Sequence, residues 1–309
     1  MTYGWSLNHL KSFLRNRNFI LILSIILGLL WGKGAQWTEG VTLPALAIVM
    51  TISTMNVSRS VFRSFRDILA PAMAGIVMNY FILGTFILGL SALLIHDEAL
   101  KVGFVIIAAV PPAVAVIPFT LFLKGDNFFS LIGTIGAYLG ALFIMPLMAL
   151  GFLGSGLYDP FKLIVIMIEL ILIPLISSRI LIRIKMDSFL NPVKGAITNW
   201  GFFLLTYTIV GLNRELILHN PLSLLPVAFI SVASTFLLGW GIEGVGKVFR
   251  LQPKILTSLL LLGTLKNYGL AGGLALALFS KKTAAPATVS AVFMIVYIIW
   301  LEFKGSWTR

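Results

Sequence analysis

Long apolar runs alternate with short polar segments along most of the chain. A helix of about 20 apolar residues crosses a bilayer. The runs predict helices near 19–36, 41–57, 69–95, 101–123, 128–153, 161–184, 195–212, 221–246, 254–279 and 284–303. The pattern therefore predicts an all-α membrane protein with ten transmembrane helices.

Composition supports a membrane protein and excludes several other classes. The chain has 309 residues, of which 59% are hydrophobic and 11% charged, whereas soluble domains carry about 25% charged residues. The net charge is +12, but no polar stretch is long enough for a basic domain, so we expect a lipid bilayer and no nucleic acid as partner. No cysteine is present, and the three histidines, His9, His96 and His219, form no metal-binding pattern. No catalytic motif appears either, so we expect neither an enzyme nor a cofactor.

The distribution of basic residues predicts the orientation. Lysine and arginine concentrate in cytoplasmic loops. With the N-terminus inside, sixteen of the 23 basic residues fall on the cytoplasmic side, six fall outside, and Lys266 falls within the membrane. The sequence therefore predicts that both termini are cytoplasmic.

Lys266 lies in the middle of the apolar stretch 259–278, which reads LLLLGTLKNYGLAGGLALAL. A charged residue at the bilayer centre costs at least about 2.5–3.5 kcal/mol and usually faces a bundle interior or a water-filled cavity. The functional interpretation is a binding site. The alternatives are a structural pairing with a buried partner, or a side chain that reaches an interface.

Two of the expected helices contain interruptions at matching positions. The fourth helix contains Pro111, Pro112 and Pro118, and the ninth contains the glycine cluster 263–273. Each is the fourth of five helices in its half, so the halves 1–153 and 154–309 predict two inverted five-helix repeats. Discontinuous helices in such repeats form transporter sites near the bilayer midplane. The alternative is a simple kink at each interruption.

Several motifs resemble the bile acid:sodium symporter family of secondary transporters. These are the segment 46–63, the stretch from Pro111 through Lys124-Gly125-Asp126 to Pro146, and Lys266-Asn267-Tyr268-Gly269-Leu270-Ala271, which falls where the family has Gln-Asn-Ser-Gly-Leu-Ala. The resemblance implies a panel domain of helices 1, 2, 6 and 7 and a core domain of helices 3, 4, 5, 8, 9 and 10. It also implies that broken helices 4 and 9 cross, and that a small or amphipathic organic anion is moved by alternating access, in a bacterial inner membrane.

The chain departs from the family pattern where sodium would bind. The resemblance implies a glutamate at Leu262, a glutamine at Lys266, a Ser-Asn pair at Val116-Ile117 and two glycines at Pro112-Ala113. Hard cations need oxygen ligands. Ser130 and Thr134 match the hydroxyl ligands of the family, but we expect this set to bind sodium poorly.

Asn79 stands where the third helix often has glutamine. Lys266 carries the same unit charge as sodium, so we interpret it as a tethered replacement for a bound cation. The protein is then an uncoupled facilitator, or a proton-coupled carrier if Lys266 titrates. Sodium symport and a receptor on a transporter fold remain alternatives.

Glu169 is the acid that lies well within an expected helix, the sixth, and is either a proton or substrate site or a structural partner. The candidate substrate and ion site comprises Asn79, Pro111, Pro112, Ser130, Thr134, Glu169, Thr264, Lys266 and Asn267.

Overall fold

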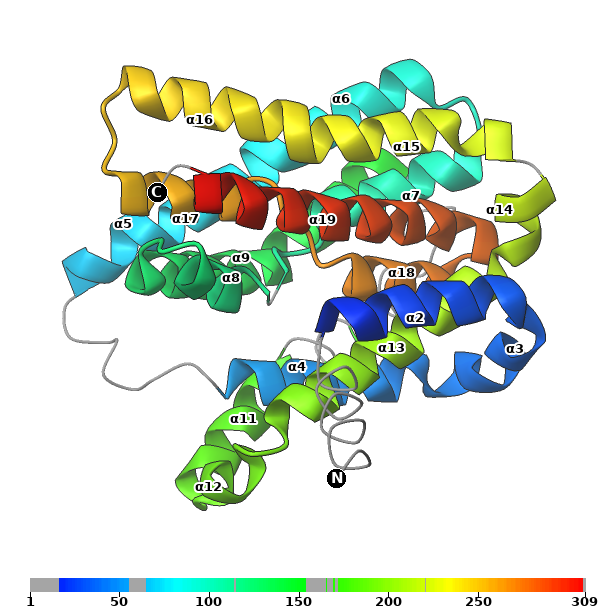
Figure 1. The fold of residues 1–309 in the computed structure, drawn as a ribbon, viewed down its shortest axis with the longest axis horizontal. Coiled ribbons are helices and arrows are strands. Elements are labelled where there is room, and N and C mark those ends of the chain that lie inside the picture. Colours follow the sequence, from blue (N-terminus) through cyan, green and yellow to red (C-terminus); the bar gives the residue numbers. More distant parts are fainter. Residues whose placement is uncertain are drawn as a thin grey trace, which may run out of the picture. The chain divides into compact units, whose positions relative to one another are not determined.

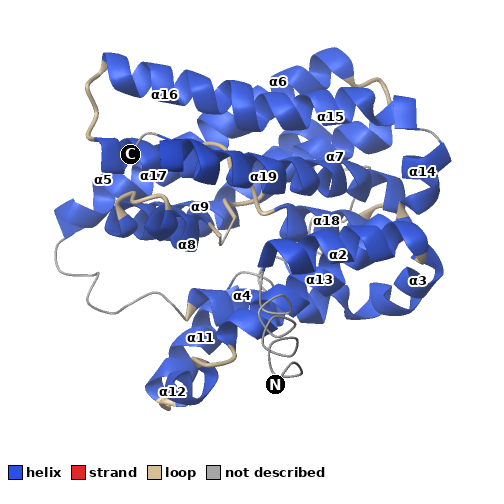
Figure 2. Cartoon of the chain, viewed as in Figure 1, coloured by secondary structure: helices blue, strands red, loops and turns tan. Residues whose placement is uncertain are grey.

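The structure is a computed structural model that describes residues 17–55, 65–113, 115–153, 165, 169, 172–219 and 221–307. These residues form helices joined by short loops, and the described part of the chain contains no β-strand (Figure 2). The fold is therefore all-helical in the described ranges, as the apolar pattern predicts.

Five helices in the described ranges are long and apolar enough to cross a membrane. They are Asp67–Leu94, Asn127–Phe152, Lys194–Leu212, Pro221–Val248 and Lys281–Lys304. The segments Phe19–Leu30 and Gly32–Ile52 make a sixth candidate if the pair, bent by 99°, is one span. The chain is therefore a multi-pass membrane protein.

The chain divides into two compact units. Unit 1 comprises residues 1–56 and 168–221, and unit 2 comprises residues 57–167 and 222–309. In unit 1 the structure describes α2 (Arg17–Leu30), η1 (Gly32–Gly34), α3 (Ala35–Thr38), η2 (Glu39–Val41), α4 (Thr42–Thr54), α11 (Ile173–Arg183), α12 (Met186–Leu190), α13 (Lys194–Leu212) and α14 (Arg214–His219).

Helix α13 is the centre of unit 1, because it packs against both α2 and α4. Small residues also allow α3 to approach α13 closely: a Cβ atom at Gly211 would lie 2.6 Å from the Cβ atom of Ala35, the first residue of α3. Thr208 and Thr38 are hydrogen-bonded across the same interface, with 2.6 Å between their hydroxyl oxygens. Small and hydroxyl residues of this kind are typical of helix contacts in membranes.

Unit 2 contains α5 (Phe65–Ile76), the π-helical η4 (Val77–Gly84), α6 (Thr85–Leu94), α7 (Glu98–Ala109), α8 (Val116–Phe122) and α9 (Asn127–Leu153). Its later part contains α15 (Leu225–Val232), the π-helical η7 (Ala233–Leu237), α16 (Leu238–Val248), α17 (Pro253–Leu262), α18 (Tyr268–Leu278) and α19 (Lys281–Trp307). The 3-10 turn η6 (Pro221–Leu224) joins the two units along the chain. In Figure 1, α15 and α16 run on from one another in yellow.

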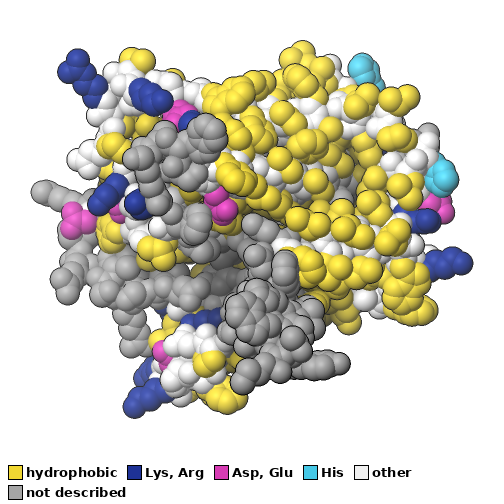
Figure 3. All heavy atoms as spheres, viewed as in Figure 1, with side chains coloured by type: hydrophobic (Ala, Val, Ile, Leu, Met, Phe, Trp, Pro, Cys, Tyr) yellow, Lys and Arg dark blue, Asp and Glu magenta, His cyan; other side chains and the backbone are white. Residues whose placement is uncertain are grey.

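Apolar side chains cover much of one face of unit 2 (Figure 3). On the face drawn in Figure 3, hydrophobic side chains cover α15, α16 and α19. Exposed apolar residues on these helices include Leu225, Phe229, Trp240 and Val296. Large apolar surface is unfavourable in water, so this face fits a lipid environment.

Candidate functional site

The two broken helices of unit 2 meet at their interruptions. Helix α7 ends at Ala109 and α8 begins at Val116, while α17 ends at Leu262 and α18 begins at Tyr268. Between the interruptions, Pro112 and Lys266 form an isolated antiparallel bridge. The unwound segments therefore pair with each other through their backbones.

Two backbone hydrogen bonds flank this bridge. The Ala113 N–H donates to the Leu265 carbonyl at 3.1 Å, and the Asn267 N–H donates to the Pro111 carbonyl at 3.0 Å. Unwound backbone inside a membrane is tolerated where it is buried in protein and its polar groups find partners. The pairing of the two breaks meets this requirement.

Local sequence explains where each helix stops. Pro111 and Pro112 have no N–H to continue the helical pattern, and Val110 is extended with ψ of 152°. At the second break, Asn267 caps α18: its side-chain oxygen accepts from the Leu270 N–H at 3.0 Å. Asparagine is among the preferred residues at this position.

The Lys266 side chain is fully buried at the crossing. Its Nζ donates to the Asn79 side-chain oxygen at 2.7 Å, to the Ala108 carbonyl at 2.7 Å and to the Val110 carbonyl at 2.9 Å. Asn79 lies in η4, and the two carbonyls belong to the C-terminal end of α7. The negative end of the α7 dipole thus faces a cation.

The ring of Tyr80 adds a further contact to the ammonium. Lys266 Nζ lies 4.7 Å from the ring centroid, within the range of cation–π attraction. Tyr80 is held in turn, because its hydroxyl donates to the Ala137 carbonyl at 2.8 Å. No carboxylate in the described ranges forms an ion pair with Lys266. The buried charge is therefore balanced by dipoles and a ring face.

Ser130 and Thr134 lie on α9 and are both buried. The Ser130 hydroxyl accepts from Thr120 at 2.7 Å. The Thr134 hydroxyl oxygen has no hydrogen-bond partner among the described residues. Gly133, next to Thr134, faces Leu262, since a Cβ atom added at Gly133 would lie 2.7 Å from Leu262 Cδ1. An apolar side chain therefore reaches α9 beside the unpaired hydroxyl.

The sequence was compared with known proteins. The model of the family described as "Sodium Bile acid symporter family" matches residues 43–220, which is more than half of the chain. The chain belongs to this family. The matched range includes the break between α7 and α8, whereas Lys266 lies beyond the matched range.

One relative is the "Uncharacterized sodium-dependent transporter YocS" of Bacillus subtilis (strain 168). It is 22% identical over 289 residues, which cover 93% of this chain and 87% of the relative. The family and this relative identify the chain as a membrane transporter and not as an enzyme. The predicted membership of the symporter family is thereby confirmed.

The structure of this family member brings together five of the nine candidate residues: Asn79, Pro111, Pro112, Lys266 and Asn267. The Thr264 hydroxyl donates to the Leu260 carbonyl at 2.7 Å, one helical turn back. Glu169 lies in unit 1 and is exposed. Its role stays a prediction.

Sequence reasoning missed two aromatic residues at the crossing. Tyr80 lies against the Lys266 ammonium, and the Tyr138 hydroxyl accepts from the Asn267 side chain at 3.1 Å. The signal for Tyr80 was its place directly after Asn79 in an apolar helix. The carbonyls that hold Lys266 carry no signal in the sequence, because every residue has one.

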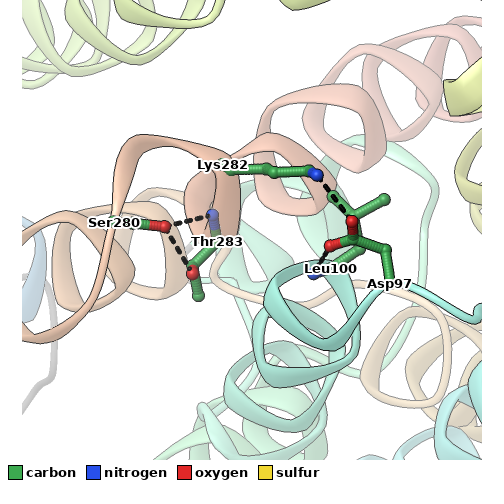
Figure 4. Close-up of polar contacts among 5 residues, drawn as sticks. All are labelled: Asp97, Leu100, Ser280, Lys282 and Thr283. Atoms are coloured by element: carbon green, nitrogen blue, oxygen red, sulfur yellow. Dashed lines mark hydrogen bonds and ion pairs between the residues drawn. The ribbon is translucent and has the colours of Figure 1, made fainter.

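A second polar cluster ties the start of α7 to the start of α19 (Figure 4). Asp97 caps α7 by accepting from the Leu100 N–H at 3.2 Å, and its other oxygen accepts from Lys282 Nζ at 2.5 Å. The hydrogen bond from Lys282 lowers the pKa of the Asp97 carboxyl below its usual range. Ser280 caps α19 by accepting from the Thr283 N–H at 3.2 Å.

The turn at Asp126 makes a corresponding contact with the start of α17. Ser258 donates to the Asp126 carbonyl at 3.0 Å and accepts from the Asp126 N–H at 3.0 Å. The Asp126 N–H also donates to the Lys254 carbonyl at 3.0 Å. Each broken helix is thus held to the other half of unit 2 at the break and also at one outer end.

Proposed function

We propose that the protein is a sodium-independent secondary transporter of a small or amphipathic organic anion, in which Lys266 takes the place of a bound cation. The organic anion comes from the name of the family and from the buried positive charge, which lies at the break between two helices. The observation that carries the proposal is the contact of Lys266 Nζ with three oxygen acceptors.

The donor count supports a permanently charged Lys266. An ammonium has three N–H donors, and the crossing offers one side-chain oxygen and two carbonyls within 2.9 Å. A neutral amine has two N–H donors and would leave one buried acceptor unpaired, at a cost of about 1–3 kcal/mol. On this donor count we propose a facilitator with a fixed charge, and the proton-coupled carrier is the alternative that a pH gradient tests.

The residues near Thr134 give a reason to propose sodium independence. Sodium is a hard cation and needs several oxygen ligands. Here Leu262 is fully buried and packs toward α9, where it supplies no oxygen from its side chain. The names of the family and of the Bacillus subtilis relative both favour the second candidate, sodium symport, in which Ser130, Thr134 and backbone carbonyls would bind the ion.

We further propose ten transmembrane helices arranged as two inverted repeats, residues 1–153 and 154–309. Corresponding elements support this by their spacing of 154–156 residues: α7 to α17 (98 to 253), α9 to α19 (127 to 281) and η4 to η7 (77 to 233). The breaks follow the same spacing, since Lys266 comes 154 residues after its bridge partner Pro112.

Units 1 and 2 serve, in this proposal, as the panel and core domains. Unit 1 contains residues of the expected helices 1, 2, 6 and 7, and unit 2 contains those of the other six. Relative motion of the units would give alternating access. The distribution of basic residues supports cytoplasmic termini, and we assign the protein to a bacterial inner membrane.

The experiment is uptake of radiolabelled organic anions by proteoliposomes that contain the full chain. Sodium, pH and voltage gradients are imposed one at a time, and protein-free liposomes are the control. We expect uptake with choline in place of sodium and no acceleration by a pH gradient. Uptake that needs a sodium gradient would refute the tethered cation and support the sodium symporter. Uptake that follows the pH gradient would refute the permanent charge.

A further inference from the structure

The loop that joins α16 to α17 exposes apolar side chains between basic ones. Val248 and Phe249 are 80% and 73% exposed. Lys247 precedes them and Arg250 follows, and both are exposed. Arg250 adopts φ of 52°, which turns the chain sharply after Phe249. The loop thus presents an apolar tip with a basic residue on each side.

Two more basic residues lie close to this loop. Lys254 is exposed at the start of α17, and the Lys254 carbonyl accepts from the Asp126 N–H at 3.0 Å. This hydrogen bond places the turn that contains Asp126 and the exposed Lys124 beside α17. Figure 3 shows Lys and Arg side chains gathered at the end of unit 2 where α16 meets α17. We define the loop patch as Lys124, Lys247, Val248, Phe249, Arg250 and Lys254.

Acidic side chains leave most of this charge uncompensated. Glu243 forms ion pairs with Lys304 and, at 3.9 Å, with Lys247. In the described ranges, no carboxylate forms an ion pair with Lys124, Arg250 or Lys254. The loop patch therefore keeps three unpaired positive charges around its apolar tip.

Aromatic residues indicate that the loop patch lies at the membrane surface. Trp240 and Trp300 have ring centroids 6.1 Å apart, and Lys304 Nζ lies 5.0 Å from the Trp300 ring. Tryptophan is enriched at the level of the lipid headgroups. The patch follows Trp240 by about two turns of α16, so it lies on the headgroup side of these rings.

We propose that the loop patch binds the phosphate headgroup of an anionic lipid. Basic clusters that follow a transmembrane helix attract anionic lipids, at about 1 kcal/mol per Lys or Arg near the surface. Phe249 and Val248 enter the boundary between headgroups and acyl chains, and the basic residues contact the phosphate. The basic N-terminal segment, with Lys11, Arg15 and Arg17, is a poor occupant because it would add charge of the same sign.

The test is native mass spectrometry of the purified full chain with phosphatidylglycerol or phosphatidylcholine added at equal concentration. We expect retention of phosphatidylglycerol over phosphatidylcholine. In the triple variant Lys124→Gln, Arg250→Gln, Lys254→Gln, the preference for phosphatidylglycerol should fall more than tenfold, because each charge contributes about fivefold. Phe249→Ser should weaken binding of both lipids.

Lys281→Gln is the matched control, because it removes an exposed charge at the first residue of α19, at the other end of that helix from Lys304. It should bind both lipids as the natural protein does. Equal retention of the two lipids, or an unchanged preference in the triple variant, would overturn the proposal. Displacement of phosphatidylglycerol by millimolar inorganic phosphate would also overturn it, since the ligand would then be a soluble anion. The melting temperature of each variant verifies that it is folded.

Discussion

Replacing Lys266 with glutamine removes the buried charge and introduces the residue that the family resemblance implies at this position. Glutamine is shorter than lysine and its amide has two N–H donors, whereas Lys266 Nζ donates to three oxygens. At least one buried acceptor is therefore left unpaired, and the contact with the Tyr80 ring is lost. The variant tests whether the ammonium occupies a position that a free cation can fill.

Two effects of opposite sign set the change in the free energy of unfolding of Lys266→Gln. An unpaired buried acceptor costs about 1–3 kcal/mol, so Lys266→Gln should lower the free energy of unfolding by this amount in sodium-free buffer. The acceptor oxygens that the glutamine amide does not reach are then free to bind an ion. Sodium at ten times its dissociation constant would return about 1.4 kcal/mol to the folded state. The variant should thus gain a dependence on sodium, which we expect the natural protein not to show.

The assay is the melting temperature of the detergent-solubilised full chain, measured in sodium chloride and in choline chloride at equal ionic strength. Lys254→Gln is the matched control, because Lys254 is exposed and lies on α17, the helix that precedes the break with Lys266. We expect sodium to stabilise Lys266→Gln and neither the control nor the natural protein. Stabilisation of the natural protein by sodium, equal to that of the variant, would refute the reasoning.

Three further predictions concern other contacts within unit 2. Asn79→Leu removes an acceptor from a buried ammonium and should lower the free energy of unfolding by about 2 kcal/mol or more. Asn79→Asp keeps an oxygen acceptor and should not lower it. Thermal unfolding measures both variants. The pKa of Asp97 is lowered by Lys282, so this pair stabilises the folded state above about pH 4 and its contribution is lost as the pH falls further. Because the pair is half exposed, the difference in melting temperature between Asp97→Asn and the natural protein should reflect at most about 1 kcal/mol at pH 7 and should shrink as the pH falls below about 4. A Cβ atom at Gly75 would lie 2.0 Å from a backbone oxygen of α9, so Gly75→Ala should cost about 3 kcal/mol, while Gly89→Ala, with open space, should cost nothing.

The apolar pattern predicted the helices well because burial in lipid leaves a long periodic signal. The expected ranges 69–95, 128–153 and 284–303 match the spans that begin at Asp67, Asn127 and Lys281. The π-helical segments η4 and η7 were not predicted, since a single extra residue per turn leaves the apolar content of a helix unchanged. The count of ten helices stays a prediction, because residues 154–164 lie outside the described ranges.

The candidate site was predictable where chemistry is carried by a side chain that is costly in a membrane. Lys266 stood out for this reason, and the structure gives it a complete set of partners. Asn79 was found by resemblance, whereas Tyr80 requires knowledge of which face of η4 meets α17 and α7. The Thr264 hydroxyl lies near the break and donates to the Leu260 carbonyl one turn back, and its role in binding stays a prediction.

A cation that is covalently attached has a consequence for the charge that moves in each transport cycle. Sodium that enters with a substrate adds its charge to the net movement, whereas Lys266 returns with the protein and adds none. For a carrier with Lys266 as the tethered cation, the charge moved per cycle is therefore that of the substrate alone. A membrane potential of 100 mV is worth about 2.3 kcal/mol per unit charge. Uptake of a monovalent anion into vesicles should thus fall about fifty-fold at equilibrium when a potassium and valinomycin gradient makes the interior negative by 100 mV. Equal or higher accumulation under this potential would mean that at least one cation travels with each anion, and Lys266 would then not have replaced it.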